Sequence, residues 1–178
     1  MATHRNGRNE PADLLDCYVK ATRLIIEMFE DPERTYGSGP ALLQHCWEGY
    51  PVETLRPLLQ SQHVHLQATA AFVASELGYA AAPVLDAAIT LLTSSTTRIQ
   101  ADAMDVVAVC AADERYIALV QMLDHPVDVI RKQAEFLVGH ATAAQRDVAR
   151  RYFEGLGRPD DAKRWGSPPD ANAPPAHR

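Results

Sequence analysis

Part of the chain repeats itself at intervals of just over thirty residues. Leu58-Leu59 aligns with Leu91-Leu92, 33 residues later, and again with Met122-Leu123 after a further 31 residues. Three more columns follow at helical spacing: Leu66, Ile99 and Ile130; Ala70, Ala103 and Ala134; Val73, Val106 and Leu137. A period of this length predicts stacked helix pairs, so we expect an all-α fold, a short α-solenoid.

The composition and length agree with one helical domain carrying two tails. Apolar residues make up 47% of the 178 residues, and alanine and leucine, which favour helices over strands, dominate among them. We expect a disordered amino terminus over residues 1–10, a single solenoid domain over 11–155 and a flexible tail over 156–178. The predicted helix pairs lie at about 51–78, 82–112 and 114–141.

The charge is concentrated in the middle of the chain. The net charge is −6, and residues 40–114 hold two arginines against eight acidic residues. A nucleic-acid partner is not expected, because binding to phosphates requires a basic face. The acidic middle is either a solvated surface or a patch that faces a basic protein partner.

The cysteines and the hydropathy pattern point to a cytoplasmic protein. Cys17, Cys46 and Cys110 are odd in number and widely spaced, which favours free, mostly buried thiols. The amino terminus lacks the apolar stretch of a signal peptide, and no apolar run reaches the roughly 20 residues of a membrane span. We therefore expect no membrane partner.

The third repeat carries a recognisable motif over residues 124–134. Asp128 precedes the aliphatic–arginine pair Ile130-Arg131, and Ala134 follows four residues after the isoleucine. This segment resembles the inter-helix turn and second-helix start of a HEAT repeat. Gln67 and Gln100 stand where the family has its arginine. The resemblance covers about residues 51–141 and implies a right-handed solenoid of stacked HEAT-like helix pairs.

A narrower resemblance concerns function. The segments Gly49–Leu59 and Ala74–Gly78 are similar to small HEAT-like proteins that act as immunity partners in bacterial polymorphic toxin systems. Such proteins bind a cognate toxin and neutralise it. The resemblance implies a protein partner, and a basic one if the toxin is a nuclease.

The second helices of the pairs are expected to line one concave face. Residues six positions after Leu66, Ile99 and Ile130 point away from the core that these three form. Residues one turn away from those positions lie on the same side of each helix. The candidate partner-binding residues on this face are Phe72, Glu76, Asp102, Asp105, Phe136 and His140. They would form a groove in which two aromatic rings flank an acidic centre, a composition typical of interface hot spots.

Two features of this groove have other interpretations. Phe72 and Phe136 could pack between adjacent repeats, since phenylalanine is commonly buried. Asp102 and Asp105 share a helix face and could receive a cation from a partner. They could equally form an ordinary surface pair with Arg98, which lies four residues before Asp102.

The chain shows no pattern typical of a catalytic or metal site. His63 and His65 have no cysteine or carboxylate cluster near them in sequence. His45 and Cys46 are adjacent on a helix, so their side chains diverge and do not form a nucleophile–base pair. We expect no catalytic residue, no metal ligand and no cofactor.

These observations favour a noncatalytic protein-binding module, with an immunity protein as the leading hypothesis. An adaptor or assembly factor for a larger complex is the alternative. A HEAT-like enzyme is the remote one, because HEAT-like folds that act on alkylated DNA need a basic groove and this one is acidic.

Overall fold

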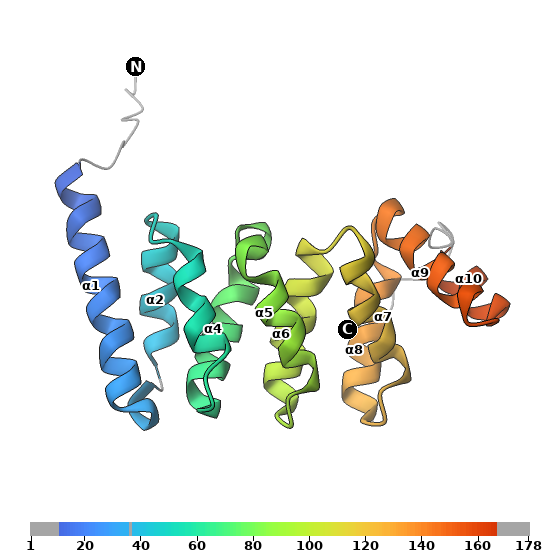
Figure 1. Ribbon diagram of the computed structural model, residues 1–178, viewed down its shortest axis with the longest axis horizontal. Coiled ribbons are helices and arrows are strands. Elements are labelled where there is room, and N and C mark those ends of the chain that lie inside the picture. The colour runs from blue at the N-terminus through green and yellow to red at the C-terminus, as the bar shows by residue number, and fades with distance from the viewer. Residues whose placement is uncertain (1–10, 36, 167–178) are drawn as a thin grey trace, which may run out of the picture.

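In the computed structural model, every regular element of residues 11–35 and 37–166, the part of the chain that the structure describes, is a helix (Figure 1). The α-helices are α1 (Pro11–Glu30), α2 (Ser38–Trp47), α3 (Arg56–Leu59), α4 (Val64–Glu76), α5 (Leu85–Thr90), α6 (Thr97–Cys110), α7 (Ile117–Gln121), α8 (Asp128–Gly139), α9 (Ala143–Gly155) and α10 (Pro159–Gly166). The 3-10 helices are η1 (Pro32–Thr35), η2 (Val52–Leu55), η3 (Gly78–Val84), η4 (Leu91–Thr93), η5 (Glu114–Tyr116) and η6 (Met122–Asp124). The all-α class predicted from the sequence is confirmed. Within these residues, no helix combines the length and the apolar character needed to cross a membrane.

The helices follow one another in a row along the long axis of the molecule, from α1 at one end to α9 and α10 at the other (Figure 1). Helices α2, α4, α6 and α8 contact each other in that order and form one layer. Helix α3 packs on α4 and α5, α5 on α6, and α7 on α6, α8 and α9. The core therefore runs lengthwise between neighbouring helices.

The repeated columns of the sequence supply this core. Side chains of the first two columns, Leu66, Ile99 and Ile130 with Ala70, Ala103 and Ala134, are all 0% exposed. The third column is buried at Val73 and Val106 but only half-buried at Leu137. Leu137 lies on α8 and stays partly open because the next helix, α9, packs on α7 and η5 of the last pair.

Gln67, Gln100 and Arg131 occupy equivalent positions in the three pairs, and all three make the same kind of hydrogen bond. Gln67 Nε2 donates to the carbonyl of Ser61 at 2.8 Å, and Gln100 Nε2 donates to that of Leu92 at 3.0 Å. In the third pair, Arg131 Nη1 donates to the carbonyl of His125 at 3.3 Å. Each side chain thus satisfies a carbonyl of the segment just before its own helix, which glutamine and arginine can both do because each carries N–H donors on a long stem.

The first helices of the pairs are less regular than the second ones. Each begins as a 3-10 helix and becomes a short α-helix, as in η2–α3, η3–α5 and η5–α7. The second pair begins at Gly78, earlier than its predicted start, because this glycine takes a left-handed conformation (φ 56°) at the end of α4 and the chain turns at once into η3.

The carboxy-terminal segment differs from the flexible tail expected over 156–178. Residues 159–166 form α10, which packs on α9 and buries Ala162. Arg158 fixes its start, with Nη1 2.6 Å from Asp124 Oδ2 and Nε 2.7 Å from Asp161 Oδ2. The rest of the expected tail, 167–178, and the amino terminus expected to be disordered, 1–10, lie outside the described residues.

We expect Ile99→Asp to unfold the protein, because Ile99 is 0% exposed and its replacement would bury an unpaired charge. The free energy of unfolding should fall by more than about 3 kcal/mol in urea denaturation. Val129→Asp is the matched control, since Val129 on α8 is 57% exposed and the change there should stay within about 0.5 kcal/mol. Equal losses in the two variants would contradict the burial pattern.

Candidate functional site

The structure places the predicted groove residues on three successive helices, α4, α6 and α8, with His140 directly after the end of α8. Their exposure differs: Glu76 and His140 are exposed, Phe136 is 50% exposed, Asp105 and Phe72 are half-buried, and Asp102 is 5% exposed. The acidic centre therefore lies lower in the surface than the residues around it.

Asp102 forms the intrahelical pair that the sequence suggested. Arg98 Nε donates to Asp102 Oδ2 at 2.9 Å, while the two side chains are 68% and 7% exposed respectively. Burial nevertheless raises the pKa of Asp102 above its ordinary value, and Glu76 adds to the rise, although Arg98 opposes it. One exposed arginine therefore compensates this carboxylate incompletely.

Asp105 lies one helical turn further along α6 and is held from the next pair. Gln133 Nε2 on α8 is 3.2 Å from both Asp105 Oδ1 and the carbonyl of Ala101, and donates to them. Burial raises the pKa of Asp105, the Gln133 hydrogen bond opposes this, and the charge of Asp102 raises it further. A cationic group placed between these two carboxyls would lower both pKa values and stabilise the charged forms.

The two predicted aromatic residues have different environments. Phe72 packs against α2, where a Cβ atom added to Gly39 would lie 3.0 Å from Phe72 Cδ1. Phe72 thus packs between its own helix and the preceding one, as the alternative interpretation expected. Phe136 keeps half of its surface open and stacks on His140 with ring centroids 4.4 Å apart, while His140 Nδ1 donates to the Phe136 carbonyl at 2.7 Å.

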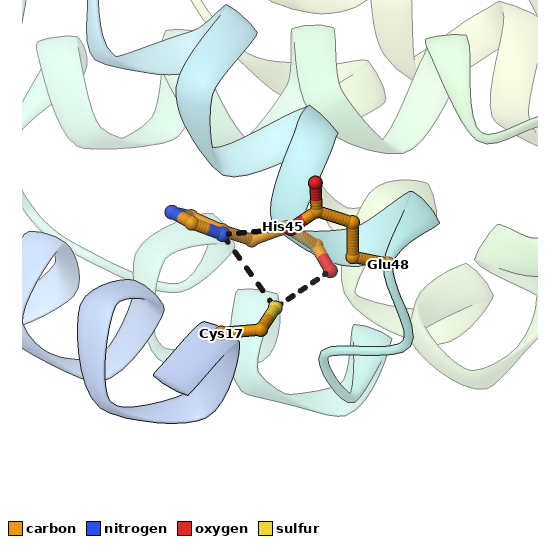
Figure 2. Close-up of side chains that lie close together, drawn as sticks. All are labelled: Cys17, His45 and Glu48. Carbon is orange, nitrogen blue, oxygen red and sulfur yellow. Dashed lines mark hydrogen bonds and ion pairs between the residues drawn. The ribbon is translucent and has the colours of Figure 1, made fainter. Parts of the chain in front are cut away.

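A second cluster, which the sequence did not reveal, joins α1 to the end of α2 (Figure 2). Cys17 on α1 places its Sγ 3.6 Å from His45 Nδ1, and the thiol donates to the His45 carbonyl at 3.7 Å. Glu48, three residues after His45, places Oε2 3.5 Å from the same Nδ1 atom. One ligand atom from each of the three residues lies within 4.8 Å of the others, a separation at which they could hold a metal ion.

The cluster differs from a cysteine–histidine catalytic site in two respects. Both Cys17 and Glu48 approach Nδ1 of His45, whereas a nucleophile and its orienting acid use opposite ring nitrogens. Cys17 is 6% exposed, and burial raises its pKa, with a further rise from Glu48. The thiol is therefore kept neutral, a poor nucleophile out of reach of a substrate.

The sequence held one signal for this cluster. Cys17, Ala21 and Met28 are buried on one face of α1, at spacings of four and seven residues. That spacing places Cys17 on the face of α1 that packs against the next helix, where His45 lies 28 residues further along the chain.

No protein-family model, curated protein or solved structure matches the chain.

We expect Asp105→Asn to stabilise the protein near neutral pH. A carboxyl whose pKa is raised by folding costs stability once the pH exceeds that raised pKa, and asparagine removes this cost while its carbonyl can still accept from Gln133. The gain in melting temperature should shrink as the pH falls through the raised pKa, where Asp105 itself becomes neutral.

Asp86→Asn is the control of opposite sign. The hydrogen bond from Arg56, 2.5 Å between Nη1 and Oδ2, lowers the pKa of Asp86. Its ionised form therefore contributes stability at neutral pH that is lost as the pH falls through the lowered pKa. Thermal melts over a pH series that gave the two variants shifts of the same sign would contradict the assignment.

Proposed function

We propose that this chain is a noncatalytic protein-binding module, a short right-handed α-solenoid of HEAT-like helix pairs that holds a basic partner in the groove of α4, α6 and α8. The observation that carries the proposal is the pair of carboxyls Asp102 and Asp105, set low in the middle helix of that face, where Asp102 pairs with the largely exposed Arg98 and Asp105 accepts from the neutral Gln133. Within this class, we propose an immunity protein of the bacterial cytoplasm that neutralises a cognate toxin.

The acidic centre supports a cationic contact at its middle. Asp102 and Asp105 have lost much of their hydration on folding, yet the cation nearest to Asp102, Arg98, is largely solvated. A lysine or arginine from a partner would complete their compensation, and a guanidinium could bind both carboxyls at once.

Exposed groups around this centre would provide the rest of the contact. Phe136 and His140 form a stacked pair at the α8 side, and Glu76 adds a further charge on the α4 side. An aromatic anchor next to a desolvated charge is the combination that dominates many interfaces. A nuclease toxin, whose substrate-binding face is basic, would be attracted to such a surface and would be blocked by it.

We expect Asp102→Lys with Asp105→Lys to abolish binding of the product of the neighbouring gene, the natural candidate for a cognate toxin. The parent protein should bind it at micromolar concentration or below and inhibit its activity, as measured by titration calorimetry and a toxicity assay. The double variant should weaken binding by at least about 100-fold, because two attractive contacts become repulsive. Because Asp102 is only 5% exposed, Asp105→Lys alone, at the half-buried position, is measured beside it, with the melting temperature of both variants.

Phe136→Ala tests the aromatic contact with the partner without changing the charge of the protein. It should weaken binding by about tenfold or more while leaving the melting temperature near that of the parent, because half of the ring is exposed. Phe72→Ala is the comparison, since it should lower stability through lost packing. If the product of the neighbouring gene neither binds nor is inhibited, the immunity proposal is wrong. If the parent and the lysine variant both retain a large complex, the adaptor alternative is favoured.

A further inference from the structure

We propose that Cys17, His45 and Glu48 form a site for a divalent cation of the zinc class, clamping α1 to α2. The three residues come from two different helical segments, and their ligand atoms are a thiol sulfur, an imidazole nitrogen and a carboxylate oxygen. This is the donor set from which proteins build zinc sites. The proposal does not depend on the function of the groove.

The distances match a tetrahedral ion. With zinc about 2.3 Å from sulfur and about 2.05 Å from nitrogen, a tetrahedral angle separates the two ligands by about 3.6 Å, and a nitrogen from an oxygen by about 3.4 Å. In the protein, Cys17 Sγ and His45 Nδ1 are 3.6 Å apart, and His45 Nδ1 and Glu48 Oε2 are 3.5 Å apart. Two of the three ligand pairs therefore already have the separation that an ion would require, and the third pair, Cys17 and Glu48, lies within 4.8 Å.

The convergence of both partners on one nitrogen favours an ion over a proton relay. A lone pair on His45 Nδ1 would point toward the space shared with Cys17 and Glu48 (Figure 2). On binding, the cation would displace the thiol proton to solvent and form a sulfur–metal bond. The thiolate and carboxylate would then balance its two positive charges, which also removes the proton that burial otherwise holds on Cys17.

The site has a position left for a fourth ligand. The Glu48 side chain is 41% exposed and that of His45 is 17% exposed, so solvent reaches the cluster from one side. Water would complete the coordination. Sulfur and imidazole ligands favour zinc or cobalt over calcium or magnesium, which prefer oxygen.

Cobalt(II) provides a direct test on the full chain. Titration of the reduced, metal-free protein should give a thiolate-to-cobalt charge-transfer absorption that saturates at one ion per chain and is displaced by zinc. Cys17→Ser should abolish the absorption, and Glu48→Gln, a change at a half-exposed position, should weaken zinc binding by at least about tenfold. Cys110→Ser is the matched control, because Cys110 donates to the Gly78 carbonyl far from the cluster in sequence and should retain full binding.

A thermal melt gives a second readout. Saturating zinc should raise the melting temperature of the parent and of Cys110→Ser, and should not raise that of Cys17→Ser. Absence of the cobalt absorption in the parent, or its survival in Cys17→Ser, would overturn the proposal.

The outer face of α1 carries a second, independent inference. It exposes a row of apolar side chains: Leu15 is 67% exposed, Val19 59%, Ile26 52% and Phe29 43%. With Thr22, these residues lie seven apart in two series, 15–22–29 and 19–26, which is the spacing of a two-helix seam. Among the described residues α1 is the first helix of the row, and its outer face is apolar where the ends of stacked repeats are usually polar.

The geometry points to a second copy of this chain as the occupant. In an antiparallel pair of α1 helices, an alignment that sets Leu15 opposite Ile26 of the second copy also sets Val19 opposite Thr22. The same alignment places Asp16 beside Arg23 of the other copy, and the two-fold axis generates this pair twice. Both residues are exposed and lie beside the apolar row on one side. Within one chain Asp16 pairs with Lys20 and Arg23 with Glu27, so a contact between copies would be shared with these pairs.

Sedimentation of the full chain tests this pairing. The parent should be a dimer at tens of micromolar, and Arg23→Asp should raise its dissociation constant by about tenfold by setting like charges together. Asp16→Arg combined with Arg23→Asp should restore the parent's value, which a nonspecific effect of either change would not do. A monomeric parent at 100 micromolar, or a dimer indifferent to Arg23→Asp, would overturn the proposal.

Discussion

The close approach of successive second helices underlies the rest of the molecule. Ala70, Ala103 and Ala134 are each excluded from water, and each lies one turn after an aliphatic residue of the first column, on the same buried face of its helix. Helices α4, α6 and α8 contact one another in that order and lie in one layer. The same approach lets Gln133 on α8 reach Asp105 on α6 and gives three helices a common face.

The periodic part of the fold could be predicted because its determinants recur along the chain, as Leu66, Ile99 and Ile130 do. What could not be predicted depends on contacts between distant segments. Helix α10 buries a single residue, Ala162, among polar neighbours, and much of its anchoring comes from Arg158 and Asp124, 34 residues apart. No local sequence pattern predicts an ion pair between residues so far apart in the chain.

The candidate sites divide in the same way. The Arg98–Asp102 pair is visible in sequence because four residues on a helix always bring side chains together. Phe72 and Phe136 occupy one column of the repeat yet differ in exposure, since Gly39 of the preceding α2 lies over the first ring. Cys17 meets His45 across 28 residues, and that meeting depends on how α1 docks.

The two candidate sites lie in different parts of the row of helices. The cluster of Cys17, His45 and Glu48 is built from α1 and the end of α2, whereas the acidic centre lies on α6 and is contacted from α8 by Gln133. Gain or loss of a helix pair between them would change the length of the layer that α4, α6 and α8 form and leave the contact between α1 and α2 as it is. Duplication of one helix pair could thus lengthen this layer without any change to the contacts between α1 and α2 at the other end of the row.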